Sequence, residues 1–294
     1  MTTTPEVAFH GADLLGELPL WNVNDCRLWW VDVSRAQLQA FDPSTGRHER
    51  FQLPGQHLGG WALRRSGGTV VALESGLHPF DPATGILGPV LTELIAPAQS
   101  QTHRPNEAKC DARGRLWIGT LDKARQPTGS LCSIGSDLKR GNVLGSIAIP
   151  NGLCFSPDGA TLYFCDSERK QIWAFDFEVD EGRICNQRVF CDLSDQPGFP
   201  DGSAVDAEGC VWNAAFGAAT IRRIDPKGRI DRVVGLPTRK VTSLAFGGAD
   251  RRTLFVTTAS AKLSPEILAA EPLAGALFAF EPGPSGLPEP RFAG

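Results

Sequence analysis

The sequence predicts an all-β fold, and three observations lead to that prediction. A short segment rich in β-branched and aromatic residues recurs six times along the 294 residues, at spacings of 42, 46, 46, 49 and 43 residues. Asp-Pro and Thr-Gly pairs supply turns after many of these segments. A sustained helical period of 3.6 residues is almost absent. Because no single unit can bury both faces of its own sheet, we expect one closed domain over residues 1–294, a six-bladed β-propeller of four-stranded blades.

Each unit is expected to contain two neighbouring strands that are easy to recognise. The recurring segments are Leu28–Val33, Val70–Ser75, Leu116–Leu121, Leu162–Ser167, Val211–Phe216 and Leu254–Ala259. The strands that follow lie within Ala36–Gly46, Gly76–Gly85, Gly129–Ile134, Lys170–Gly182, Ala219–Arg229 and Gly275–Phe280. Aromatic residues at the second position of five segments are expected to pack between blades rather than bind a cofactor: Trp29, Trp117, Tyr163, Trp212 and Phe255. A single helical turn is expected over Pro265–Ala270.

Composition argues against several classes of protein. The chain has 29 Lys and Arg against 33 Asp and Glu, a net charge of −4, and no long basic run, so neither nucleic acid nor membrane is expected as a partner. Residues 1–6 lack the features of a secretory signal, and no stretch approaches the roughly 18 apolar residues of a membrane span. The eight cysteines form no C-x-x-C pair, which is typical of reduced thiols. We therefore expect a cytoplasmic protein.

A further strand precedes each recurring segment and carries the chemically informative residues. In a propeller this innermost strand runs along the central axis, so equivalent residues of all blades converge there. The residues 10 or 11 positions before the segments are Glu17, Gly59 or Gly60, Asn106, Asn151, Asp201 and Ser243. Asn-Gly and Asp-Gly pairs are usually turns, but their agreement with Glu17 in repeat phase favours a shared site.

Carboxylates and carboxamides that meet at one axis predict a bound cation. Without a cation the carboxylates would repel each other and the polar groups would be left unpaired. Oxygen donors without Cys or His are typical of Ca²⁺, Mg²⁺ or Mn²⁺, and an open carboxylate site also accepts Zn²⁺ or Fe²⁺. One divalent metal is expected, with its identity open among these ions.

Several long motifs resemble the senescence-marker-protein/gluconolactonase family, which includes regucalcin and bacterial sugar lactonases. The similar stretches are Leu15–Trp21, Arg104–Leu121, Ile149–Ser167, Phe199–Trp212, Thr242–Asp250 and Glu271–Phe280. The resemblance implies a propeller with one catalytic divalent metal held by Glu17, Asn151 and Asp201. It also implies that Arg104 and Asn106 hold the hydroxyls and carbonyl of a sugar lactone.

Two positions depart from the pattern of this family. The family usually has Gly after the metal-binding Glu, whereas this chain has Leu18, so the strand or the pocket wall is expected to differ there. Glu107 stands where Asp is common, and we group it with the substrate-binding residues while its exact role stays open. His103, beside Arg104, is expected to be a surface histidine.

The expected reaction is hydrolysis of an aldonolactone, from an oxidative sugar pathway, to the aldonic acid. The metal would polarise the lactone carbonyl and Asp201 would act as general base. The sequence contains no G-x-S-x-G nucleophile elbow and no H-E-x-x-H motif. Two alternatives stay open: another metal-dependent ester or phosphotriester hydrolase on this fold, and a non-catalytic calcium-binding propeller. Because the ring closes its own sheet edges, we expect a monomer or a weak homo-oligomer.

Overall fold

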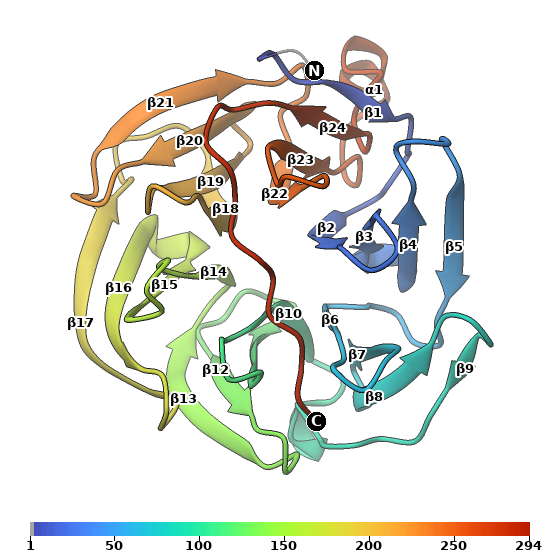
Figure 1. Cartoon of the computed structure of the whole chain (residues 1–294), viewed down its shortest axis with the longest axis vertical. Helices are drawn as coiled ribbons and strands as arrows, with labels where there is room; N and C mark the ends of the chain where they lie inside the picture. The colour runs from blue at the N-terminus through green and yellow to red at the C-terminus, as the bar shows by residue number, and fades with distance from the viewer. Residues whose placement is uncertain (1–2) are drawn as a thin grey trace.

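The chain forms a ring of sheets around a central axis. The computed structural model describes residues 3–294. Met1 and Thr2, the first two of the six residues that were compared with a secretory signal, lie outside the described residues. Within the described range the strands form six four-stranded sheets, arranged as the blades of a propeller (Figure 1). The predicted fold class is therefore confirmed.

The blades are numbered along the chain, with the strands of each given from the axis outward. Blade 1 contains β2 (Gly16–Asn22), β3 (Arg27–Asp32), β4 (Gln37–Phe41) and β5 (His48–Gln52); blade 2 contains β6 (Gly60–Leu63), β7 (Thr69–Leu73), β8 (Gly76–Asp81) and β9 (Ile86–Leu87). Blade 3 contains β10 (His103–Cys110), β11 (Leu116–Asp122), β12 (Gly129–Ile134) and β13 (Arg140–Ile147); blade 4 contains β14 (Pro150–Phe155), β15 (Thr161–Asp166), β16 (Gln171–Glu178) and β17 (Arg183–Asp192). Blade 5 contains β18 (Phe199–Val205), β19 (Val211–Phe216), β20 (Thr220–Ile224) and β21 (Ile230–Gly235); blade 6 contains β22 (Val241–Gly247), β23 (Thr253–Thr258), β24 (Leu277–Phe280) and β1 (Glu6–Phe9).

The six recurring segments form the second strands of the blades, as predicted. The aromatic residues at their second positions are at most 7% exposed, which confirms that they pack in the interior. Trp29 of blade 1, for example, lies 6.3 Å from Trp61 of blade 2 between ring centroids, and both belong to one buried cluster. The hydrophobic core thus lies between neighbouring blades. The expected helical turn is α1 (Pro265–Ala270), where the Ser264 side chain accepts a hydrogen bond from the backbone N–H of Ile267.

Blade 6 joins the two ends of the chain. Strand β1 pairs antiparallel with β24, so that Glu6 lies opposite Ala279 and Val7 lies opposite Phe278. The first strand of the chain is therefore the outermost strand of the last blade. This pairing closes the ring with backbone hydrogen bonds.

Residues 281–294, which we call the C-terminal strap, cross one face of the ring (Figure 1). Phe292 donates its backbone N–H to the carbonyl of Leu63, at the end of β6, at 2.8 Å. Ala293 donates its backbone N–H to the carbonyl of Gly114 at 2.9 Å, and the Phe292 side chain is fully buried. The strap thus covers the face where the innermost strands end, and these strands begin at the opposite face.

Two further features concern the cysteines and the helices. All eight cysteines are free, and six of them are buried. Among residues 3–294, no helix has the length and apolar character needed to cross a membrane.

Candidate active site

The predicted axial residues share one place in the strand register. Glu17 pairs with Val31, and Asn151 pairs with Cys165. In both blades the partner is the fourth residue of the recurring segment, and Asn106 has the same relation to its own blade. These three residues, which are equivalent in the sequence repeat, therefore occupy equivalent positions in their blades.

A β-bulge lies beside each of these residues. The pairing register shifts directly after Glu17 in β2, after Asn106 in β10, after Asn151 in β14, and after Pro200, at Asp201, in β18. A bulge bends its strand and re-aims the side chain beside it. The bulges therefore explain how side chains near the start of the innermost strands are directed toward a common point.

Two glycines allow these bulges for different reasons. Gly152, after Asn151, has φ of +65°, a left-handed conformation that favours glycine. Gly202, after Asp201, is instead required by close packing, because a Cβ atom there would lie 2.1 Å from Ser243 Oγ of the next blade. The Asn-Gly and Asp-Gly pairs therefore belong to the site and not to ordinary turns.

The two carboxylates of the site oppose each other electrostatically. Burial raises the pKa of Glu17 well above its usual range, and the negative charges of Asp201 and Glu107 raise it further. Burial likewise raises the pKa of Asp201, and Glu107 adds to the shift. Both groups are thus costly to ionise unless positive charge is supplied.

A divalent cation fits this arrangement. Asp201 is 6% exposed, and its Oδ1 atom is buried with no hydrogen-bond partner among residues 3–294. Buried carboxylate oxygens are normally hydrogen-bonded or bound to a cation. Glu17, Asn151 and Asp201 together offer oxygen donors, which suit a hard cation.

Arg104 and Asn106 brace the site from blade 3. Arg104 Nη1 donates to Asn106 Oδ1 at 2.7 Å. Asn106 Nδ2 donates to Pro150 O at 2.8 Å and to Asn151 Oδ1 at 3.0 Å, so both of its N–H groups are used. Burial lowers the pKa of Arg104 to about 10, while the charges of Glu17 and other nearby carboxylates oppose that shift. Arg104 therefore remains a cation at neutral pH.

Glu107 has a buried environment. It lies at the bulge of β10 with φ of +66° and is 7% exposed. Burial raises its pKa to about 7, while Lys109 and backbone N–H donors, including those of Gly152 and Leu153, lower it. Its carboxylate thus holds the backbone beside Asn151. The expected contact of Glu107 with the sugar stays a prediction.

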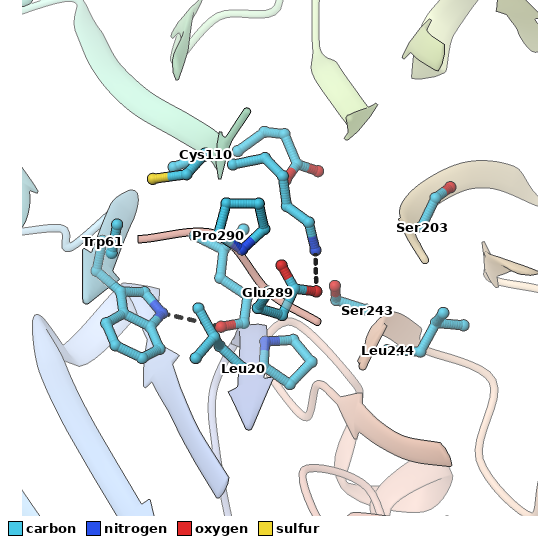
Figure 2. Close-up of a pocket in the computed structure, with 14 residues that line it drawn as sticks. Leu20, Trp61, Cys110, Ser203, Ser243, Leu244, Glu289 and Pro290 are labelled. Atoms are coloured by element: carbon cyan, nitrogen blue, oxygen red, sulfur yellow. Dashed lines mark hydrogen bonds and ion pairs between the residues drawn. The ribbon is translucent and has the colours of Figure 1, made fainter. Parts of the chain in front are cut away.

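Below the site, the axis holds a small cavity of about 20 Å³. Its wall includes Glu107, Lys109, Ser203, Ser243 and Glu289. Glu289 comes from the C-terminal strap and points inward, and its Oε1 lies 2.6 Å from Lys109 Nζ (Figure 2). An ion pair thus lines the axis between the strap and the site.

Comparison with known proteins identifies the family. The family model described as SMP-30/Gluconolactonase/LRE-like region matches residues 15–260. The chain belongs to the SMP-30/gluconolactonase/LRE-like family. The resemblance seen in the sequence motifs is thereby confirmed.

Relatives in this family are similar over nearly their whole length. The 6-deoxy-6-sulfogluconolactonase of Pseudomonas putida is 36% identical over 295 residues, covering 100% of both chains. The L-arabinolactonase of Azospirillum brasilense is 33% identical, covering 95% of this chain and 92% of its own. The crystal structure of regucalcin, a calcium-binding protein from Agrobacterium tumefaciens, matches with a TM-score of 0.92 and 30% identity, covering 97% of this chain and 96% of that one.

Leu18, the departure from the family's usual glycine, has a left-handed backbone with φ of +52°. This conformation costs a residue with a Cβ atom about 1 to 2 kcal/mol. Two contacts offset the cost: the side chain is 9% exposed within the cluster that contains Trp61, and the Leu18 carbonyl accepts a hydrogen bond from Trp61 Nε1 at 2.9 Å (Figure 2). The expected alteration is thus a strained but well-packed bulge.

Sequence reasoning missed Glu74, whose negative charge opposes the lowering of the Arg104 pKa. Its Oε1 lies 2.6 Å from His57 Nδ1. The signal was in the repeat, because Glu74 occupies the same segment position as Asp32 and Asp166. Those two carboxylates accept backbone N–H groups just before the innermost strand of their own blade. An acidic residue at this position marks the turn beside the site.

The expectation for His103 was wrong. His103 is 4% exposed. Its Nε2 lies 3.0 Å from Thr128 Oγ1, and its Nδ1 lies 2.9 Å from Thr102 Oγ1. It is a buried, hydrogen-bonded histidine.

A second cluster of metal-binding residue types lies in blade 5, and protein groups satisfy it. Asp206, Glu208 and Cys210 bring their ligand atoms within 4.8 Å of one another. Arg223 donates to Asp206 Oδ2 at 2.9 Å and also pairs with Glu208, and Trp212 Nε1 donates to the same Asp206 oxygen at 2.9 Å. The two carboxylates of this cluster are therefore already paired with protein groups.

Proposed function

We propose that the chain hydrolyses a sugar lactone to the corresponding aldonic acid, with one divalent cation held by Glu17, Asn151 and Asp201. Relatives named 6-deoxy-6-sulfogluconolactonase and L-arabinolactonase support a sugar lactone as substrate. The observation that carries the proposal is the buried Oδ1 of Asp201, which has no hydrogen-bond partner in the described part of the chain and whose carboxylate repels that of Glu17. A divalent cation would balance the two negative charges, and a Lewis acid of that kind accelerates ester hydrolysis.

Asp201 is the proposed general base. When bound, the cation would supply a Lewis acid for the lactone carbonyl. The Asp201 carboxylate removes a proton from the attacking water, and the water oxygen bonds to the carbonyl carbon. The bond from this carbon to the ring oxygen then breaks, and the proton passes from Asp201 to that oxygen. The balance is one water consumed and one aldonic acid formed.

Arg104 is the proposed contact for the sugar. Its positive charge suits a lactone carbonyl or hydroxyl oxygen, and it also opposes part of the rise in the pKa of Glu17 and Asp201. Asn106 acts mainly by holding Asn151 and the preceding backbone, since both of its N–H groups are engaged. Its Oδ1 retains one lone pair for a sugar hydroxyl.

The test is acid release from a panel of aldono-1,4- and aldono-1,5-lactones, followed with a pH indicator. Chelator-treated protein is assayed with Mn²⁺, Zn²⁺, Ca²⁺, Mg²⁺ or anaerobic Fe²⁺ added back. We expect at least one cation to restore turnover well above spontaneous hydrolysis. If the metal-bound protein hydrolyses none of these lactones faster than they hydrolyse spontaneously, the lactonase assignment is overturned. That result would favour another ester or phosphotriester substrate, or a calcium-binding role like that of the Agrobacterium regucalcin.

A variant pair tests the base. Asp201→Asn should lower kcat by about 10²- to 10⁴-fold, the usual contribution of general base catalysis. Asp137→Asn, at an exposed turn of blade 3, is the matched control and should keep wild-type turnover. Near-wild-type turnover by metal-loaded Asp201→Asn would rule out the base assignment.

A further inference from the structure

The backbone carbonyl before each expected metal ligand accepts a hydrogen bond from a side chain of the preceding blade. The ligands are Glu17, Asn151 and Asp201, each at the start of an innermost strand. Asn106 Nδ2 donates to Pro150 O at 2.8 Å. Ser167 Oγ donates to Pro200 O at 2.7 Å, and Thr242 Oγ1 donates to Gly16 O at 2.5 Å. The same device thus recurs at all three ligand-bearing strands.

Ser167 connects two of the ligands directly. It is 5% exposed and begins the short turn η3 (Ser167–Arg169) after β15. Its Oγ accepts a hydrogen bond from Asn151 Nδ2 at 2.9 Å while donating to Pro200 O. The first bond engages Nδ2, so coordination falls to Asn151 Oδ1, which has a second lone pair besides the one that accepts from Asn106. The second bond holds the residue before Asp201.

Thr242 performs the corresponding role where blade 6 meets blade 1. It is fully buried, and its Oγ1 donates to Gly16 O, one residue before Glu17. The same Oγ1 also lies 2.9 Å from Thr257 Oγ1 in the neighbouring strand of blade 6. The hydroxyl is thus anchored in its own sheet and reaches across the blade boundary.

These contacts matter because the ligands come from three different sheets. Backbone ladders fix distances within a blade, but the relative positions of strands in different blades depend on side-chain contacts. A coordination site needs its ligands held to within about 0.5 Å. We propose that Ser167 and Thr242 are positioning residues that set the spacing of the metal ligands across blade boundaries, an inference that rests on the proposed function.

The test measures metal binding separately from turnover. Chelator-treated protein is titrated with Mn²⁺, and free Mn²⁺ is followed by electron paramagnetic resonance. Ser167→Ala and Thr242→Val should bind Mn²⁺ about 10- to 100-fold more weakly than wild type, as is usual when a partner behind the ligands is removed. Ser167→Thr and Thr242→Ser restore a hydroxyl and should recover most of the affinity, which also shows that the positions tolerate substitution.

A threonine in blade 2, which carries none of the expected ligands, gives the matched control. Thr69 is 1% exposed, and its Oγ1 donates to Phe80 O at 3.0 Å. Thr69→Val therefore removes a comparable buried hydrogen bond and should lower the thermal unfolding temperature while leaving Mn²⁺ affinity unchanged. Wild-type affinity in Ser167→Ala and Thr242→Val, or equal weakening in Thr69→Val, would overturn the inference. Wild-type protein that binds no cation would instead overturn the proposed metal site, so the two failures are distinguishable.

Discussion

Asn106 Nδ2 lies 3.0 Å from Asn151 Oδ1, so a residue expected to hold the sugar also contacts a residue expected to hold the cation. We predict that Asn106→Ala lowers Mn²⁺ affinity by about 10- to 100-fold, because Asn151 and the Pro150 carbonyl both lose a donor. A residue that contacts only substrate would raise KM without this effect. Equilibrium titration of chelator-treated protein, beside steady-state kinetics, separates the two.

Arg104→Lys is the comparison for that variant. Lysine keeps the positive charge but lacks the planar guanidinium that reaches Asn106 Oδ1 and the substrate. We expect a higher KM with little change in Mn²⁺ affinity. Equal losses of metal affinity in both variants would contradict the separate roles given to Arg104 and Asn106.

Leu18→Gly is predicted to be destabilising, although glycine is the usual family residue. Relief of the left-handed strain contributes about 1 to 2 kcal/mol. Loss of the buried leucine side chain costs about 2 to 5 kcal/mol, so the free energy of unfolding should fall. Urea unfolding of both proteins measures the difference. A more stable glycine variant would show that strain, not packing, dominates at this bulge.

Glu289→Gln is predicted to lower the free energy of unfolding by about 2 kcal/mol, because Lys109 would lose its charged partner near the axis. The two side chains are 16% and 18% exposed, so water screens them only in part. The double variant Glu289→Met with Lys109→Met should recover part of the loss. Urea unfolding of wild type, Glu289→Met, Lys109→Met and the double variant gives the coupling free energy, and a value near zero would show that the pair contributes nothing.

Asp13 is predicted to make stability depend on pH. Burial raises its pKa from 3.8 to about 6; Asp32 adds to the shift, while Arg50 and hydrogen bonds from Trp30 and Gln39 oppose it. The pKa of Asp13 is higher in the folded chain than in the unfolded chain. The contribution of Asp13 to the free energy of unfolding is therefore fully present below the unfolded pKa and is lost as pH rises through the folded pKa. The shift corresponds to roughly 3 kcal/mol.

Asp13→Asn removes this titration. The free energy of unfolding of wild type minus that of Asp13→Asn should therefore fall by roughly 3 kcal/mol between about pH 3 and about pH 8. Urea unfolding at several pH values measures the difference. A constant difference would mean that Asp13 titrates alike in the folded and unfolded chains.

The sequence was most informative where structure follows from repetition. The second strands, the third strands and the register positions of Glu17 and Asn151 are all related by one period, so each blade supports the assignment of the others. The bulge at Asp201 could also be anticipated from its Asp-Gly pair, once the phase was known. Periodicity thus predicted the blades and the convergence of their polar residues on the axis.

Contacts that join different blades were beyond that reasoning. The Glu107 carboxylate accepts hydrogen bonds from backbone N–H groups of blade 4, which lies beside it only in the folded ring. Within blade 3, Thr128 Oγ1 lies 3.0 Å from His103 Nε2, and no repeat relates these two residues. The place of the strap was equally unpredictable, since Phe292 packs beside Leu63 from the other end of the chain. Local pattern says nothing about such pairs, which depend on three-dimensional packing.

The pairing of β1 with β24 has a consequence for biosynthesis. Blade 6 lies between blades 5 and 1, and its strand Leu277–Phe280 is made after all the strands of blades 1 to 5. A nascent chain can assemble the earlier blades, but Thr242 and Gly16 meet only when the ring closes. The cation site should therefore mature only after blade 6 has been synthesised, and metal loading would follow the closure of the ring.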